Sequence, residues 1–106
     1  MTSVAVEITR YVDASFPGWV ELVLRDARGA AWTFIEKVPV VSTESLTESS
    51  SFPRAGTIAC EVVPTSSEAA GSGLVEIDTS RPLGIEAKDG TTRFLVRDSQ
   101  LRRSFS

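Results

Sequence analysis

The feature that most constrains the fold of this chain is an alternating stretch between Trp19 and Lys37. Large apolar and β-branched residues recur there at every second position, which is typical of half-buried strands. A short connection, Asp-Ala-Arg-Gly at residues 26–29, separates two such runs. Glycine at its last position favours a type I turn followed by a left-handed residue, which closes a three-residue hairpin loop. The sequence therefore predicts a β-hairpin of residues 19–25 and 31–37.

The turn also predicts the register of this hairpin, because it places Asp26 opposite Ala30. One face then consists mainly of large apolar side chains and is expected to face the core; its pairs are Leu24–Trp32, Leu22–Phe34 and Val20–Glu36. The other face is mixed; its pairs are Val23–Thr33, Glu21–Ile35 and Trp19–Lys37. A slip of one residue would bury Glu21 and Arg25, so the register is well specified.

Three residues of the mixed face, Trp19, Val23 and Ile35, are too apolar for a surface that is fully in contact with water. Two interpretations are open. Either the N-terminal strand or the C-terminal tail covers them, or they form an exposed patch that binds a partner. Trp19 opposite Lys37 is also a candidate cation–π pair on the surface. These three residues are the candidate partner interface.

Further short strands are predicted along the rest of the chain, because alternating segments are separated by turn signals. The segments outside the first hairpin are 2–12, 56–63, 74–78, 84–88 and 91–97. Asp89-Gly90 predicts a second hairpin with a two-residue type I′ turn. That turn would pair Glu86 with Arg93 and Ile85 with Phe94.

Six or seven short strands without a helical period or an internal repeat indicate an all-β fold. The length of 106 residues suits a single domain, residues 1–106, that can bury a core without disulfides or metal. We expect a small antiparallel β-barrel, with a β-sandwich as the alternative. Residues beyond Pro39 are expected to continue in extended form through Val40 and Val41.

The loops and the tail carry few large apolar residues. Residues 42–54 read as a solvated connection pinned by Leu46 and Phe52, with a partner-binding or lid loop as the functional alternative. Residues 64–73 are rich in Ser, Ala and Gly and are expected to form an exposed loop. Residues 98–106 read as a tail or a single helical turn, with Leu101 and Phe105 as packing anchors.

The absence of histidine is the most informative compositional feature for function. It excludes Ser-His-Asp and Cys-His nucleophilic sites and His-ligated metals.

The single cysteine, Cys60, lies in an apolar run and is expected to be a small core residue in a reducing compartment. Glu36 lies at the end of the row of core-facing residues that contains Trp32 and Phe34. There it is expected either to line a barrel mouth, to pair with Arg10 or Arg54, or to reach water. We therefore expect no enzyme, no cofactor and no metal site.

The charge of the chain limits its partners. A net charge of −3 and a pI of about 4.9 disfavour binding to phosphate backbones, so we expect no nucleic-acid partner. Arg97, Arg102 and Arg103 cluster near the C-terminus, as a solvated tail or a small basic patch. No stretch approaches the roughly 20 apolar residues of a membrane helix, and residues 1–10 lack the pattern of a signal peptide. We expect no membrane association and a cytoplasmic location.

Four segments resemble parts of small uncharacterised bacterial proteins; they are residues 16–21, 34–40, 60–62, and 84–86 together with 89–90. Some similar small acidic domains are immunity proteins, which neutralise a toxin by binding it. The resemblance implies a non-catalytic protein-binding domain and carries no catalytic residues. Two alternatives remain open from the residues: a self-associating structural protein, or homo-oligomer, that uses the same apolar patch, and a barrel that binds a small ligand.

Overall fold

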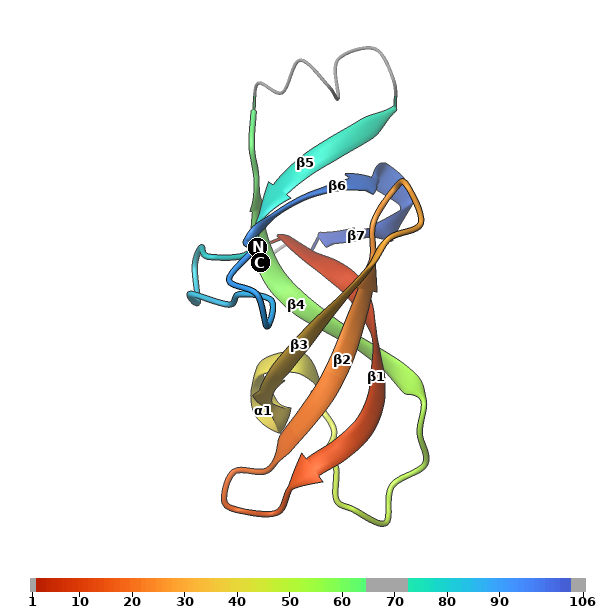
Figure 1. Ribbon diagram of the computed structural model, residues 1–106, viewed down its shortest axis with the longest axis vertical. Coiled ribbons are helices and arrows are strands. Elements are labelled where there is room, and N and C mark those ends of the chain that lie inside the picture. The colour runs from red at the N-terminus through yellow and green to blue at the C-terminus, as the bar shows by residue number, and fades with distance from the viewer. Residues whose placement is uncertain (1, 65–72, 104–106) are drawn as a thin grey trace.

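The computed structural model describes residues 2–64 and 73–103 and shows an all-β fold within them. One curled antiparallel sheet forms a half-barrel, and a short helix lies beside it (Figure 1). The elements are β1 (Thr2–Asp13), β2 (Trp19–Arg25), β3 (Ala31–Lys37), α1 (Val38–Val41), β4 (Arg54–Val62), β5 (Leu74–Asp78), β6 (Arg93–Arg97), a 3₁₀ turn η1 (Asp98–Gln100) and β7 (Leu101–Arg103). The predicted barrel-like, all-β architecture is confirmed.

Strand β1 lies at the centre of the sheet. The strand order is β3-β2-β1-β4-β5-β6, and β7 pairs with β1 beyond the end of β2. The first half of β1, Thr2–Ile8, pairs with β4, and the second half, Glu7–Asp13, pairs with β2. The register with β2 shifts between Ile8 and Arg10 and again between Tyr11 and Asp13. Such bulges increase the local twist of a strand, which contributes to the curl of the sheet.

The first hairpin has the predicted register along its whole length. The Asp26 N–H donates to the carbonyl of Ala30 (2.9 Å), and the Gly29 N–H donates to the carbonyl of Asp26 (3.0 Å). Gly29 has a φ of +85°, the left-handed conformation that the turn requires. The face predicted to be core is buried, since its residues Val20, Leu22, Leu24 and Phe34 have no exposed surface. Alternation and turn chemistry therefore sufficed to predict this hairpin.

The predicted second hairpin is wrong in two respects. Residues 85–88 do not form a strand, and the turn has a three-residue loop, because the Ala87 N–H donates to Thr91 and the Gly90 N–H donates to Ala87. Strand β6 pairs instead with β5, which brings Phe94 opposite Ile77. Ile85 and Phe94 are both buried, as expected, but they enter the core from different elements.

A further correction concerns Arg93, which was expected to pair with Glu86. Its guanidinium lies 3.5 Å from the Glu76 carboxylate and 3.7 Å from that of Asp78. Both carboxylates belong to β5, the strand that β6 joins. The ion pairs of Arg93 therefore follow the strand pairing that buries Phe94.

Helix α1 replaces the extended segment expected at Val40 and Val41. Pro39 lies in its first turn, where the missing proline N–H costs nothing. Val38 and Val41 lie one turn apart and are both buried, and α1 contacts β3 and β4. The helix therefore fills the open side of the half-barrel. The connection after it is anchored, as predicted, by Leu46, which is buried, and Phe52, which packs against the core.

The two ends of the sheet meet through a few hydrogen bonds, and we call this junction the seam. The Ala27 N–H of the β2–β3 turn donates to the Leu95 carbonyl on β6 (2.8 Å). The Lys88 N–H donates to the Thr33 carbonyl on β3 (2.9 Å), and Gln100 Nε2 donates to the Arg25 carbonyl (2.7 Å). These bonds satisfy edge groups that would otherwise be open to pairing with another chain.

The C-terminal expectation is confirmed in part. Residues 98–100 form the 3₁₀ turn, and Leu101 is buried on β7. Phe105 and most of the expected loop 64–73 lie outside the described residues. In the ranges that the structure describes, no helix has the length and apolar character needed to cross a membrane.

Gly56 offers a test of the packing between β4 and α1. A Cβ atom at this position would lie 2.7 Å from Ile8 Cδ1 and 2.9 Å from the Val41 carbonyl oxygen. Because a backbone atom cannot yield as easily as a side-chain end, we expect Gly56→Ala to lower the free energy of unfolding by about 1–3 kcal/mol. Urea denaturation measures this change. The exposed Glu61→Ala on the same strand is the control, and an equal effect of both variants would contradict the close approach.

Candidate functional site

The structure places the three candidate interface residues on the outer face of the β2–β3 hairpin. Trp19 and Val23 lie on β2, and Ile35 lies on β3 opposite Glu21. All three are half-buried. The Lys37 ammonium lies 5.6 Å from the Trp19 ring centroid, which confirms the cation–π pair.

An ion pair interrupts this apolar set. Glu21 lies between Trp19 and Val23 along β2, and its carboxylate accepts hydrogen bonds from Arg10 Nε (3.1 Å) and Thr9 Oγ1 (3.0 Å). The hydrogen bond from Arg10 is the main reason that the pKa of Glu21 is lowered. The three residues therefore share one face but do not form a continuous apolar patch.

Strand β1 and the described C-terminal strand β7, the covers considered for this face, do not lie across it. Strand β1 lies beside β2 in the same sheet, and β7 pairs with β1, so both extend the sheet sideways. In Figure 1 no described element passes in front of the β2–β3 hairpin. Gln100 of η1 lines the same open hollow as Val23, so the start of the C-terminal segment reaches the edge of this face. Residues 104–106 of the expected tail lie outside the described part of the chain.

The most exposed large apolar side chain of the described residues is Phe16, at 98%. It lies on the turn between β1 and β2, which connects Val12 near the end of β1, 41% exposed, with Trp19 at the start of β2. We call residues 12–19 the tip. Full burial of such a side chain is worth about 1.5–3 kcal/mol, a free energy that folding of this chain does not gain and that binding of a partner over Phe16 can gain. From the sequence this segment is expected only to be a connection. The aromatic residue directly before Pro-Gly is the one sequence feature that could have indicated an exposed anchor.

The turn that carries Phe16 is braced on both sides. The Ser15 N–H donates to the Asp13 carboxylate (2.8 Å), and the Gly18 N–H donates to the Ser15 carbonyl (2.7 Å). The Val38 N–H then donates to the Gly18 carbonyl (2.9 Å), which ties the turn to α1. Gly18 has a φ of +91°, and a Cβ there would lie 2.6 Å from Tyr11 Oη. Phe16 is therefore held outward by a defined backbone rather than by a loose loop.

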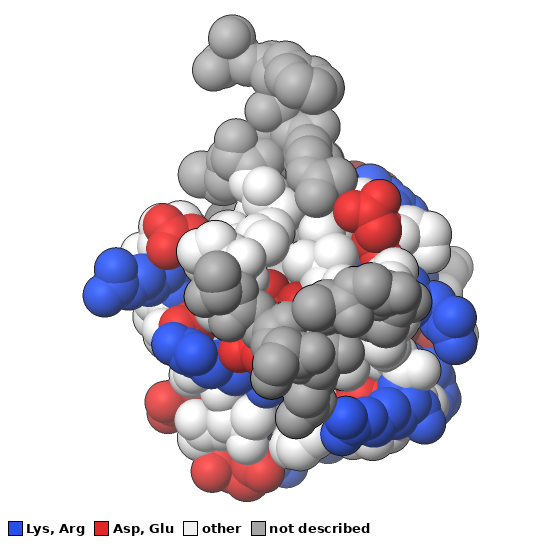
Figure 2. Space-filling view, turned by 90° about the horizontal axis from the view of Figure 1, so that it is seen from above, with Lys and Arg blue, Asp and Glu red and all other residues white. Residues whose placement is uncertain are grey.

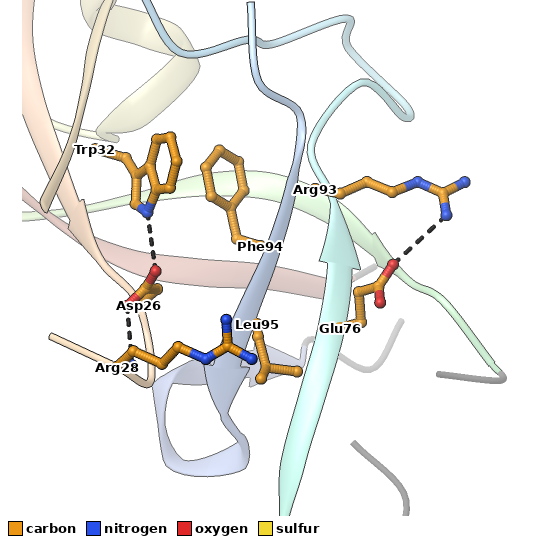
Figure 3. A pocket seen from close by; sticks show the side chains of 7 residues that line it. All are labelled: Asp26, Arg28, Trp32, Glu76, Arg93, Phe94 and Leu95. Atoms are coloured by element: carbon orange, nitrogen blue, oxygen red, sulfur yellow. Dashed lines mark hydrogen bonds and ion pairs between the residues drawn. The ribbon is translucent and has the colours of Figure 1, made fainter. Parts of the chain in front are cut away.

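A second candidate site is a small open pocket of about 240 Å³ at the seam (Figure 3). The β2–β3 turn contributes Asp26 and Arg28, β3 contributes Trp32, and β5 and β6 contribute the remaining lining residues, Glu76, Arg93, Phe94 and Leu95. Trp32 packs edge-on against Phe94, with ring centroids 5.3 Å apart. The volume lies below the roughly 300–1,000 Å³ typical of small-molecule sites.

The charges of this pocket are engaged within the protein. The Asp26 carboxylate accepts hydrogen bonds from Trp32 Nε1 (3.0 Å) and from the backbone N–H groups of Arg28 (2.9 Å) and Ala30 (3.0 Å). Burial alone would raise the pKa of Asp26, but these hydrogen bonds outweigh it and lower the pKa. Arg93 is likewise paired with carboxylates of β5. The polar side chains that line the pocket therefore stabilise the seam.

Two further residues weighed for chemistry have structural surroundings. Cys60 is 2% exposed, and burial raises the pKa of its thiol to about 11, so the thiolate is scarce at neutral pH. Glu36 is half-buried and accepts a hydrogen bond from the Lys37 N–H (3.2 Å). Arg10 and Arg54, its predicted partners, pair with Glu21 and Glu44 instead.

The described residues bring together no group of three or more Cys, Asp or Glu side chains that could hold a metal ion. The C-terminal arginines are partly engaged, since Arg102 Nη1 donates to the carbonyls of Ser99 (2.9 Å) and Leu101 (3.1 Å). Comparison with known proteins adds nothing to this geometry, because no protein-family model, curated protein or solved structure matches the chain.

Asp26 offers a test of the seam. We expect Asp26→Ala to lower the free energy of unfolding by about 1–3 kcal/mol at neutral pH, because three N–H donors lose a charged acceptor. The pKa of Asp26 is lowered in the folded protein, so its contribution is complete above the unfolded value of about 3.9 and is lost as the pH falls through the folded pKa. Denaturation of both proteins at neutral and acidic pH should show the difference shrinking in acid. The exposed Glu86→Ala serves as the control, and a pH-independent difference would contradict this account.

Proposed function

We propose that the protein is a non-catalytic protein-binding domain that uses Phe16 as its anchor. The observation that carries this proposal is the almost complete exposure of Phe16 on a turn braced at Ser15 and Gly18. Aromatic side chains that fill a partner's pocket commonly dominate binding energy. A braced turn also loses little conformational freedom on binding, which favours affinity.

The surroundings of Phe16 support the same function. Trp19 and Lys37 stack on the adjacent outer face, and Val12 is partly exposed beside the turn. An aromatic centre with polar and charged neighbours is the usual composition of a protein interface. In this proposal Trp19 belongs to the interface, whereas Val23 and Ile35 lie at its margin, beyond the Arg10–Glu21 ion pair.

The proposal extends to a specific activity, inhibition of a bacterial toxin by binding. The resemblance to immunity-type proteins points to this activity. It is also consistent with a chain that has no histidine and a single cysteine, because an inhibitor that masks another protein needs no reactive groups of its own.

The test is an affinity capture from cells that naturally produce the protein, with Phe16→Ala and Leu83→Ala compared with the wild type. Leu83 is the matched control, since it is 55% exposed and lies on a different turn. We expect Phe16→Ala to weaken binding of the wild-type partner by about 30-fold, equivalent to about 2 kcal/mol, as for an interface hot spot. Leu83→Ala should bind like the wild type.

Two outcomes would contradict the proposal. Equal affinity of the wild type and Phe16→Ala for every stoichiometric partner would remove Phe16 as the anchor. A partner whose toxic activity is unchanged in the presence of a saturating amount of the protein would contradict the inhibitory activity but not the binding function. Both variants change exposed side chains, so each is expected to keep the wild-type thermal unfolding midpoint.

A further inference from the structure

Most of the net charge of the protein lies at the end of the molecule that carries Phe16. Residues 10–21 and 35–54, which we call the tip end, contain five carboxylates and three basic side chains, a net charge of −2 out of −3 for the chain. Figure 1 shows the β1–β2 turn and the 42–53 connection at the same end of the long axis. Figure 2 shows the opposite end, where acidic and basic side chains are interspersed.

Ion pairs neutralise only two of the five carboxylates at the tip end. Glu21 pairs with Arg10 at 3.1 Å, and Glu44 pairs with Arg54 at 2.6 Å. The three others are Asp13, Glu36 and Glu48.

Those three carboxylates have no ion pair with a basic side chain of the described chain. Asp13 and Glu36 accept hydrogen bonds from backbone N–H groups, and Glu48 is exposed. The remaining basic residue of the tip end, Lys37, lies over the Trp19 ring. The tip end therefore combines an exposed aromatic side chain with three carboxylates that have no ion pair among the described residues.

We infer that the tip end recognises a basic protein surface with an apolar cavity that accepts Phe16. The inference rests on the proposed function, because it assigns the chemistry of the partner to the same anchor. Opposite charge accelerates the encounter of two proteins and disfavours partners of like charge. The same carboxylates repel phosphate backbones and anionic lipid surfaces, so the charge pattern selects a basic protein among macromolecules.

The probe for this inference is a random peptide library displayed on phage and selected against the immobilised protein. We expect the enriched peptides to carry a net positive charge together with apolar residues. The double variant Glu36→Lys/Glu48→Lys should bind these peptides about tenfold more weakly at low ionic strength. The loss should become smaller as salt is added, because exposed charges are screened.

The matched control is Glu61→Lys/Glu86→Lys, which makes the same change of charge at exposed carboxylates outside the tip end. It should bind the peptides within about twofold of the wild type, since screening limits charge effects beyond the interface. Equal losses in both double variants, or enrichment of neutral or acidic peptides, would overturn the inference.

Phe16→Ala separates this inference from the proposed function. If Phe16→Ala abolishes binding while Glu36→Lys/Glu48→Lys does not weaken it, the anchor holds and the basic partner is wrong. If the peptides are basic and sensitive to charge reversal but bind Phe16→Ala unchanged, the charge inference holds and the anchor is wrong. A library from which no peptide is enriched on the wild-type protein contradicts both.

Discussion

The rest of this structure depends on the hydrogen bonding of β1 to three other strands. Its first residues pair with β4 on one edge and β7 on the other, and its last residues pair with β2. Two register shifts against β2 let this one long strand bend from one partner to the next. The extra residues that cause the bending are Thr9 and Val12, and both also shape the outer surface. Thr9 donates a hydrogen bond to Glu21, and Val12 is exposed at the start of the tip. Bulges are often found next to functional sites, and here the second bulge adjoins the turn that carries Phe16.

The closure of the half-barrel depends on different interactions. The seam is made by a few hydrogen bonds between segments distant in sequence, such as Ala27 with Leu95, and by the contact of Trp32 with Phe94. Asp26 serves both the turn and the seam, because its carboxylate accepts two backbone N–H groups and the Trp32 indole N–H. Local turn chemistry and tertiary closure are therefore coupled through one side chain. The same coupling accounts for the position of the small pocket, which lies where the turn meets β6.

Only part of the candidate site could be predicted from the sequence. Alternation placed Trp19, Val23 and Ile35 together on one face, and the structure agrees. Alternation also placed Glu21 between them, but its ion pair with Arg10 was not predictable, because that pair requires the bulge that sets Arg10 opposite Glu21. Phe16 was overlooked for a related reason. A turn residue can fold back onto the domain or point outward. Here the outcome is decided by the hydrogen bond that the Gly18 N–H donates to Ser15 and by the one that the Gly18 carbonyl accepts from Val38 of α1.

The sequence by itself determined the first hairpin and the all-β class. Alternation over two seven-residue arms and a glycine at the last turn position act locally, so no other part of the chain was needed to specify that register. Only the tertiary structure decided the partner of residues 93–97. Asp89-Gly90 provides a turn whichever strand follows, whereas pairing with β5 buries Phe94 against Ile77 and gives Arg93 two carboxylates. Several strands share the same alternating pattern, so the choice between them depends on how much apolar surface each pairing buries, a property of the assembled core.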